Sequence, residues 1–514
     1  MAINISPTIR NDPYLLQGLG RGIEKESLRV STEGVLSGQP HPYALGSALT
    51  HPSITTDFSE AQLELITGVH TKPESCLAEL ETIHRFVHAN IGDELLWPAS
   101  MPCVVGTDHN IPIGHYGTSN IGIAKSVYRR GLGVRYGRLM QTISGIHYNF
   151  SIPDDLWSAL GVSDQIARTD AYFGLIRNFR RWSWLLIYAF GASPAVCKSF
   201  TQSGAHALEQ LDEGTHYLPG ATSLRMGPLG YQSSAQTSLH ISYNSLQAYA
   251  DSMVQALTTP YPDYEASGLI DAHGDHQQLS TSMLQIENEF YGTIRPKRTI
   301  QIGERPVTAL RTRGVEYVEV RCIDLNPFLP LGIDAEEIRF IDTFLLTCLF
   351  SESAPDTVDE SHRIAQNQLA VVERGREDGL RLHADASGDI SLTDWADAVL
   401  ADCAVVAALL DQANGTEAYS AAVVRQREKV IDPGLTPSAL SLAAMRETKT
   451  PFFRFAMDHA MNISQAFKDT PMPSATASRM LAEVENSHQR QRDAEAMDTL
   501  TFDEFLLDYL ALPE

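Results

Sequence analysis

Cysteine is scarce in this chain. Only six of the 514 residues are cysteines, they lie far apart, and no two form a CxxC pair. This spacing argues against a disulfide framework and against a zinc knuckle. Because free cysteine is usually buried, we expect reduced, mostly buried thiols. The six residues are Cys76, Cys103, Cys197, Cys322, Cys348 and Cys403.

Long apolar runs and a leader pattern are also lacking. The longest apolar run, around WSWLLIYAFGA, is shorter than the roughly 20 residues that a helix needs to span a bilayer. The first residues, MAINISPTIRNDPYLL, show neither the basic start nor the apolar centre of a signal peptide. We therefore expect a cytoplasmic protein with no membrane partner.

Positive charge is limited. The chain has 39 lysines and arginines against 63 aspartates and glutamates, which gives a formal net charge of −24, and no long basic run interrupts this excess. Such a charge repels nucleic-acid backbones and anionic membranes. We therefore expect no nucleic-acid partner.

The common nucleotide-binding motifs are missing as well. No GxxxxGK[ST] is present, and the glycine-rich GLGRG of residues 18–22 precedes a strand-like segment instead of opening a helix. Any ATP must therefore be bound without a P-loop or a dinucleotide fingerprint. The GxSxG elbow of serine hydrolases is also absent.

The sequence does contain carboxylates on apolar strand faces. In GIEKESLRV, residues 22–30, the two-residue period of a strand aligns Glu24 and Glu26 with Leu28 and Val30. Ionised groups drawn toward a core are costly unless a cation compensates them. We therefore expect something cationic between these side chains.

Four further segments repeat this pattern of polar groups on strand-like faces. They are SGIHYNFSI with His147 and Asn149, GVEYVEVRCIDLNPF with Glu319 and Arg321, TTDFSEAQLELIT with Asp57 and Glu64, and LQIENEFYG with Glu287, Glu289 and Tyr291. Helical segments lie among them without regular strand-helix-strand order. This mixture predicts an α+β fold in which several strands line one concave surface.

The residue types on this surface suggest a metal. Many carboxylates with one imidazole and no thiolate suit Mg²⁺ or Mn²⁺. Arg321 beside Glu319, and Arg129 in SVYRRGL, would bind a phosphoryl group, so the combination favours ATP. The same residues would also fit a solvated sheet face, a surface ion pair, a two-metal phosphohydrolase, or a non-catalytic protein that binds divalent ions.

Beyond residue 330 the pattern becomes helical. Residues 391–415 begin with Ser391 and Asp394 in capping-box spacing and end at Asn414-Gly415. The tail from residue 478 is typical of a charged amphipathic helix followed by a short docking helix, and we interpret its polar face as solvated. We expect a catalytic part, residues 1–330, continuous with a mainly helical scaffold, residues 331–514, and a monomer.

Eight segments between Gly18 and about Pro330 closely resemble the glutamate-cysteine ligase family of the bacterial type, and the likeness continues more weakly to the C-terminus. In order they are RGIEKESLRV, GSALTHPSITTDFSEAQLELIT, WPASMPC, YGTSNIGIAKSVYRRGL, MQTISGIHYNFS, FGASPAVC, LQIENEFYGTIRPKR and GVEYVEVRCIDLNPF. The family is similar in fold to glutamine synthetase. The resemblance implies a curved antiparallel sheet that forms a catalytic funnel, with helices packed outside.

The resemblance also implies the chemistry. ATP would phosphorylate the γ-carboxylate of L-glutamate, and the amine of L-cysteine would displace phosphate to give γ-glutamylcysteine, the first step of glutathione synthesis. By the same match, two or three Mg²⁺ or Mn²⁺ ions would be held by Glu24, Glu26, Asp57, Glu64, His147 and Glu319. Arg129 and Arg321 would bind the transferred phosphoryl group. The substrate-binding residues would be Phe58, Tyr128, Gln141, Asn149, Arg225, Tyr231, Asn288 and Tyr291.

Within that substrate set the resemblance separates the roles. Arg225 would bind a substrate carboxylate, Asn149 would orient substrate or metal, and the others would surround cysteine. The chain departs from the family's pattern at Ile123, where relatives carry a basic residue, and at Gly220, where they carry a bulkier one. We expect both positions near binding loops. A sister ligase with another amine acceptor is the nearest alternative function.

Overall fold

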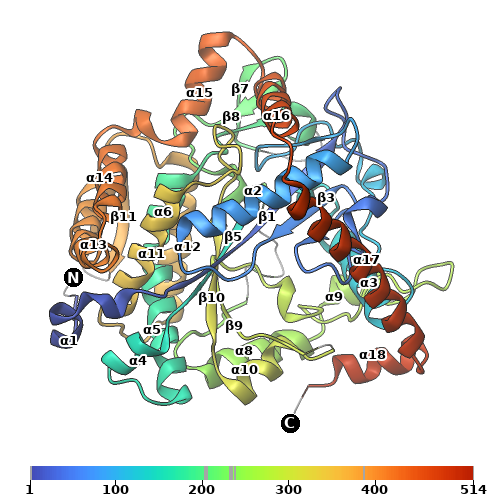
Figure 1. Ribbon diagram of the computed structural model, residues 1–514, viewed down its shortest axis with the longest axis horizontal. Helices are drawn as coiled ribbons and strands as arrows, with labels where there is room; N and C mark the ends of the chain where they lie inside the picture. The colour runs from blue at the N-terminus through green and yellow to red at the C-terminus, as the bar shows by residue number, and fades with distance from the viewer. Residues whose placement is uncertain are drawn as a thin grey trace.

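An antiparallel sheet of seven strands crosses the middle of the computed structural model, which describes residues 3–201, 206–230, 236, 239–301, 303–385 and 388–512 (Figure 1). The strand order is β2-β3-β1-β5-β10-β9, and β4 pairs with β1. The strands are β1 (Gly20–Val30), β2 (Ile54–Thr56), β3 (Gln62–Ile66), β4 (Leu95–Leu96), β5 (Ile146–Ser151), β9 (Ile294–Lys297) and β10 (Tyr317–Ile323). The α+β fold with a helical C-terminal part is thus confirmed.

Helices surround this sheet. In the N-terminal two thirds they are α1 (Pro7–Asn11), α2 (Pro73–Asn90), α3 (Asn120–Tyr136), α4 (Asp154–Ala159), α5 (Gln165–Trp182), α6 (Trp184–Phe190), α8 (Leu246–Thr258), α9 (Pro262–Ser267) and α10 (Pro306–Arg313). The rest are α11 (Ala335–Phe350), α12 (Val358–Arg374), α13 (Leu392–Asn414), α14 (Ala418–Ile431), α15 (Pro437–Thr448), α16 (Phe452–Lys468), α17 (Ser474–Met497) and α18 (Phe502–Leu510). Figure 1 shows α11, α13 and α14 on one side of the sheet and α3, α17 and α18 on the other.

The strand alternation separates two faces of the sheet. Ile23, Tyr148 and Val320 point into the main hydrophobic cluster, to which α5, α6 and α11 contribute. Glu24 pairs across the sheet with His147 and therefore lies on the opposite face. The strands predicted within residues 22–30, 144–152 and 314–328 are confirmed as β1, β5 and β10, and both faces of these strands are largely buried.

The hydrophobic core joins the two expected parts of the chain. One cluster of buried residues extends from Ile5 to Val484 and includes side chains of the sheet, α5, α11 and α13. The predicted helix at residues 392–414 is confirmed: Ser391 accepts a hydrogen bond from the backbone N–H of Asp394, and Gly415 ends the helix in the left-handed conformation.

One prediction about local structure is wrong. Residues 287–289 form a 3₁₀ turn and not a strand, because Glu287 bonds the guanidinium of Arg305, and Glu289 bonds Arg135 at 2.9 Å. Residues 295–298, RPKR, lie mostly within edge strand β9, and Arg295 is buried.

The cysteine prediction is only partly right. Cys76, Cys322, Cys348 and Cys403 are free and buried, as expected. The other two, Cys103 and Cys197, form a disulfide, with Cα atoms 5.2 Å apart. They are 94 residues apart in sequence, so no local motif could indicate the pair. Packing of the segment after β4 against strand β6 (Ala195–Cys197) in a second hydrophobic cluster brings them together.

Two small sheets lie outside the main one. Strand β6 pairs with β8 (Thr215–Tyr217), which pairs with β7 (Glu209–Asp212). A hairpin of β11 (Arg381–Asp385) and β12 (Gly388–Ser391) interrupts the helical C-terminal part. In the part of the chain that the structure describes, no helix combines the length and apolar character needed to cross a bilayer.

Candidate active site

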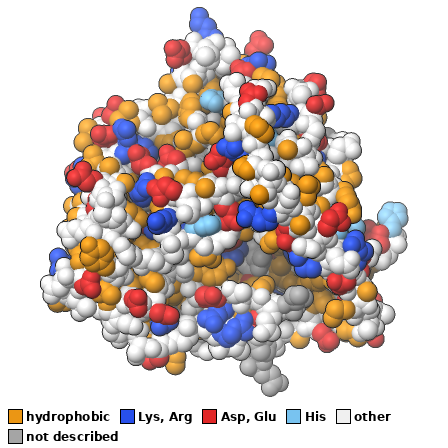
Figure 2. Space-filling view, viewed as in Figure 1, with side chains coloured by type: hydrophobic (Ala, Val, Ile, Leu, Met, Phe, Trp, Pro, Cys, Tyr) orange, Lys and Arg blue, Asp and Glu red, His pale blue; other side chains and the backbone are white. Residues whose placement is uncertain are grey.

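A cavity of about 660 Å³ lies against the polar face of the sheet. Strands β1, β3, β5, β9 and β10 contribute side chains on one side, and α3, α17 and α18 contribute on the other. The space-filling view shows the surface hollowed between the sheet and the C-terminal helices (Figure 2). Strands and helices far apart in sequence therefore enclose one site.

The sheet side of the cavity is acidic. Two groups of three side chains each have ligand atoms within 4.8 Å of one another: Glu24, Glu64 and His147 form one, and Glu26, Asp57 and Glu64 form the other. Glu64 belongs to both groups. The structure thus brings together five of the six residues predicted to hold metal ions, and Glu319 adjoins them, its Oε1 3.9 Å from His147 Nδ1.

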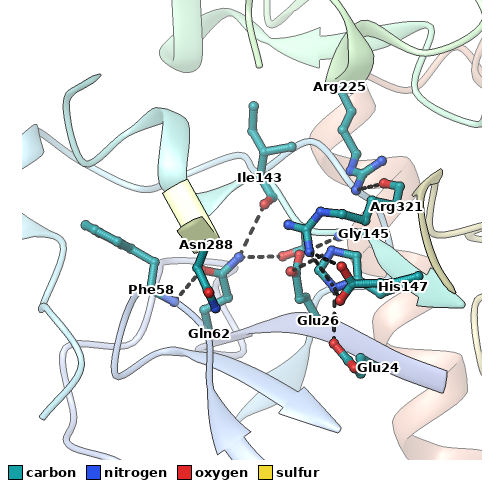
Figure 3. A network of polar contacts seen from close by, with 12 residues as sticks. Glu24, Glu26, Phe58, Gln62, Ile143, Gly145, His147, Arg225, Asn288 and Arg321 are labelled. Carbon is teal, nitrogen blue, oxygen red and sulfur yellow. Dashed lines mark hydrogen bonds and ion pairs between the residues drawn. The ribbon is translucent and has the colours of Figure 1, made fainter. Parts of the chain in front are cut away.

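Strand register explains this convergence. Glu24 lies opposite His147, Glu26 lies opposite Glu64, and Glu319 lies opposite Asn149. Directly paired residues of antiparallel strands place their side chains about 5 Å apart on one face. Glu24 Oε2 lies 3.3 Å from His147 Nδ1 (Figure 3). Its Oε1 accepts a hydrogen bond from Asn149 Nδ2 at 2.8 Å.

The carboxylates differ in their electrostatic surroundings. Burial, and then the charge of Asp57, raise the pKa of Glu26 to about 8. Burial and the neighbouring acids Glu24, Asp57 and Glu26 likewise raise the pKa of Glu64 well above its usual value. Both carboxylates thus lie where negative charge is poorly compensated by the protein itself.

Glu319 shows the opposite behaviour. Burial alone would raise its pKa, but Lys297, whose Nζ is 2.9 Å away, and Arg321, at 3.1 Å, hold that pKa well below its usual value. The acidic surface therefore has a compensated end at Glu319 and an uncompensated end at Glu26 and Glu64.

The donor atoms fit a hard divalent cation. His147 Nε2 and Asn149 Oδ1 are buried and have no hydrogen-bond partner among the described residues. Burial, and then Arg321, lower the pKa of His147, which leaves the imidazole neutral and able to donate a lone pair. Oxygen-rich ligands with one imidazole suit Mg²⁺ or Mn²⁺, and such a cation would compensate Glu26 and Glu64.

The two predicted phosphoryl-binding arginines line the same cavity. Arg129 on α3 is held by the backbone carbonyls of Asp57 and Lys125 and lies over the ring of Tyr116, 4.4 Å from its centre. Arg321 on β10 donates to Glu319 and lies 3.4 Å from His147 Nδ1. Both guanidinium groups therefore lie next to the acidic surface, that of Arg129 on α3 and that of Arg321 on β10.

The predicted substrate residues divide into two sets. Tyr128, Gln141, Asn288 and Tyr291 line the cavity, and Gln141 Nε2 donates to the hydroxyl of Tyr291 at 3.1 Å. Phe58, Asn149 and Arg225 are not part of the cavity lining. Phe58 is fully buried in a small apolar cluster, and Asn149 bonds Glu24. Tyr231 lies outside the described residues.

Arg225 is the main departure in that set. It is fully buried, donates to the backbone carbonyl of Arg321 at 2.9 Å, and has Asp324 at 3.7 Å (Figure 3). It thus braces the strand that carries Arg321, and it does not itself face the cavity. The sequence alone cannot distinguish these two positions, because both require a cation near the same strand.

Several cavity residues were not identified from the sequence. Lys125 lies one helical turn before Arg129, and Lys297 lies two residues after Arg295, on the same face of β9. The helix and strand periods could therefore have identified Lys125 and Lys297 from the sequence. Arg490, Ala494 and Tyr509 of α17 and α18 also line the cavity. The interpretation of the tail as scaffold with a solvated face is therefore incomplete, since one of its faces covers the site.

The two family departures lie outside the cavity lining. Ile123 packs against the same small apolar cluster that side chains of α18 contact. Gly220, expected near a binding loop, is packed against the end of α12, where an added Cβ would approach Arg374 Cα to 3.2 Å. A larger side chain at Gly220 would therefore require movement of α12.

Comparison with known proteins agrees with this geometry. Residues 8–371 match the family described as glutamate-cysteine ligase. The chain is 48% identical over 506 residues to a glutamate–cysteine ligase of Alcanivorax borkumensis, covering 96% of each, and 49% identical over 507 residues to one of Pseudomonas paraeruginosa, covering 98% of this chain and 95% of the relative.

A solved structure gives the same answer. The crystal structure of a Francisella tularensis glutamate–cysteine ligase in complex with AMP superimposes with a TM-score of 0.92 at 38% identity, covering 96% of this chain and 98% of that one. Sequence and fold agree over nearly the whole length. This chain belongs to the glutamate-cysteine ligase family.

Proposed function

We propose that this protein joins the γ-carboxylate of L-glutamate to the amine of L-cysteine with consumption of ATP. The observation that carries the proposal is the pair of acidic groups sharing Glu64, with Arg129 and Arg321 at the edges of the same cavity. A carboxylate oxygen of glutamate attacks the γ-phosphorus of ATP, and ADP leaves. The cysteine nitrogen then attacks the acyl carbon, loses a proton, and phosphate leaves.

The metal ligands would be Glu24, Glu26, Asp57, Glu64, His147 and Glu319, holding two or three Mg²⁺ or Mn²⁺ ions. When bound, these ions neutralise the negative charge that accumulates where ATP meets a carboxylate. The protein prepares the site without them in two ways. Register pairing fixes the carboxylates on one face, and the low pKa of His147 keeps its imidazole available.

The arginines position the phosphoryl group. Arg129 is locked by backbone carbonyls, so its guanidinium needs little reorganisation when an anion arrives. Arg321 is held in place by Glu319 on the same strand. Such positioning accounts for most of the catalysis in phosphoryl transfer. A planar guanidinium can bind two phosphate oxygens at once, which a lysine cannot.

The cysteine pocket would lie at Tyr128, Gln141, Asn288 and Tyr291. The Gln141–Tyr291 hydrogen bond fixes the orientation of an aromatic wall that suits a small thiol side chain. Phe58 and Tyr231 would complete the surroundings of cysteine, and Asn149, which bonds Glu24, would orient substrate or a bound metal. Arg225, which donates to the backbone carbonyl of Arg321, would bind a substrate carboxylate.

We further propose a cytoplasmic monomer that acts on small molecules, with neither nucleic acid nor membrane as partner. The net charge of −24 supports this, because anionic polymers and surfaces would be repelled. The proposed product would make this the first step of glutathione synthesis.

The acyl-phosphate route can be tested by isotope transfer. With glutamate carrying ¹⁸O in its γ-carboxylate, each turnover in the presence of ATP, cysteine and Mg²⁺ should move one ¹⁸O into the released phosphate. Mass spectrometry of phosphate and of γ-glutamylcysteine measures both products. Phosphate without ¹⁸O, or phosphate release that needs no glutamate, would favour a phosphohydrolase and contradict the proposal.

A further inference from the structure

Two cations lie side by side on the cavity face of α3. Lys125 and Arg129 are four residues apart, one turn of the helix, and both line the cavity. Both also lie over the ring of Tyr116, with Lys125 Nζ 5.3 Å and Arg129 Cζ 4.4 Å from its centre. The same aromatic side chain therefore supports both positive charges.

Most cations around the cavity already have partners. Lys297 pairs with Glu319, and Arg321 donates to the same carboxylate. Arg295 bonds the backbone carbonyls of residues 288 and 290, and Arg490 bonds a backbone carbonyl and Glu483. Each of these cations therefore has at least one partner within the protein.

Lys125 differs from all of them. Among the described residues that line the cavity, it is the one cation with neither a hydrogen bond nor an ion pair from its side chain. Burial, and then repulsion by Arg129, lower its pKa to about 8, although Glu64 opposes the shift. A partly buried ammonium beside a guanidinium is unfavourable unless an anion compensates both.

The chemistry of that anion follows from the pairing of the cations. A single carboxylate would compensate one charge and leave the other exposed to repulsion. A phosphate chain carries several negative oxygens over a length that two neighbouring cations can bind together. Arg129 already faces the acidic surface where, under the proposed function, phosphoryl transfer occurs, so the chain would extend from there along α3.

We propose that Lys125 Nζ binds the phosphate chain of ATP beside Arg129, as a nucleotide-binding residue of this site. The proposal rests on the proposed function of the cavity. Under this proposal, one turn of α3 binds the nucleotide, and the acidic side chains of the sheet bind the metal ions.

The test compares Lys125→Met with Lys125→Arg and with Lys72→Met, a matched removal of an exposed lysine at the start of α2. Loss of a charge-assisted contact predicts an increase of about ten- to a hundredfold in the KM for ATP and in the Kd of Mg·ADP for Lys125→Met. The KM values for glutamate and cysteine should change little. Lys125→Arg should retain most nucleotide affinity, and Lys72→Met all of it.

The Kd of Mg·ADP comes from isothermal titration calorimetry, and circular dichroism confirms that each variant is folded. Unchanged nucleotide affinity in folded Lys125→Met, or an effect confined to the KM for glutamate, would overturn the assignment. Wild-type enzyme that forms γ-glutamylcysteine while Lys125→Met binds Mg·ADP normally refutes only this inference. Wild-type enzyme that forms no such product refutes the proposed function itself.

Discussion

Residues on one strand face can have opposite electrostatic roles. Glu319 has its charge compensated by Lys297 and Arg321, whereas Glu64 faces three other acids. An ion pair stabilises its members without help from a ligand, but a cluster of like charges is stable only with a bound cation or proton. Glu64 should therefore depend on metal more strongly than any other carboxylate at the site.

We expect Glu64→Gln to weaken Mn²⁺ binding by at least about tenfold, because Glu64 takes part in both acidic groups and loss of an anionic ligand costs more than about 1.4 kcal/mol. Electron paramagnetic resonance of free Mn²⁺ gives the affinity directly, without turnover. Glu33→Gln in an exposed turn is the matched control. Equal Mn²⁺ affinity in both variants would remove Glu64 from the metal site.

At the scale of elements, helices α3 and α18 form one wall of the cavity. Helix α3 presents Lys125 and Arg129 to the cavity and packs Ala124 and Val127 against aromatic side chains of α18. Helix α18 has no fully buried residue, and Tyr509 at its end lines the cavity. Its position therefore depends on a small apolar contact and a few polar ones, including His276 to Asp503 at 2.8 Å.

Phe505→Asp should detach α18 from α3, because it places a carboxylate in that apolar contact. We expect kcat/KM to fall roughly tenfold, about 1.4 kcal/mol, through loss of the Tyr509 wall, while the fold persists. Leu507→Asp is the control on the same helix, since Leu507 is 75% exposed. Limited proteolysis should cut the tail of Phe505→Asp first. If both variants keep wild-type kinetics, α18 does not contribute to the site.

At the scale of the whole molecule, we infer that residues 1–330 and 331–514 form one folding unit. The main hydrophobic cluster combines the sheet with α11 and α13, and Arg21 of β1 forms a buried ion pair with Asp342 of α11 at 2.7 Å. Breaking such a pair leaves a buried charge without compensation. Stability should therefore be shared across the chain.

Buried histidines make that stability depend on pH. His51 is 6% exposed, and its Nδ1 accepts hydrogen bonds from the backbone N–H groups of Ser53 and Ile54, so protonation there breaks both. Burial is the main reason its pKa is lowered to about 4, although Glu483 of α17 opposes the shift. Because the folded pKa lies below the unfolded value, the unfolded chain binds more protons between about pH 4 and pH 6.5.

Stability should therefore fall as the pH decreases through that window, and His51 alone contributes up to about 1.4 kcal/mol per pH unit. His51→Asn keeps a hydrogen-bond acceptor but cannot titrate, so its free energy of unfolding should depend less steeply on pH. Urea unfolding at pH 7, 6 and 5 in wild type and variant measures the difference. If the free energy of unfolding has the same pH slope in wild type and variant, His51 is protonated equally in the folded and unfolded states.

Local pattern determined much of this protein. The two-residue alternation of residues 22–30, 144–152 and 314–328 identified three strands and predicted that Glu24, His147 and Glu319 could line one concave surface. Capping residues identified the helix at 392–414. These features depend only on residues close together in the sequence, because backbone geometry sets the periods of strands and helices.

Long-range packing decided the rest. The Cys103–Cys197 disulfide, the burial of Arg225 behind Arg321, and the 3₁₀ turn at residues 287–289 each depend on partners that are distant in the chain. The placement of Tyr509 at the cavity, almost 400 residues from Lys125, has the same origin. Periodicity shows which way a side chain points, but only the folded chain decides what it meets, because contacts between distant segments depend on how all the elements pack together.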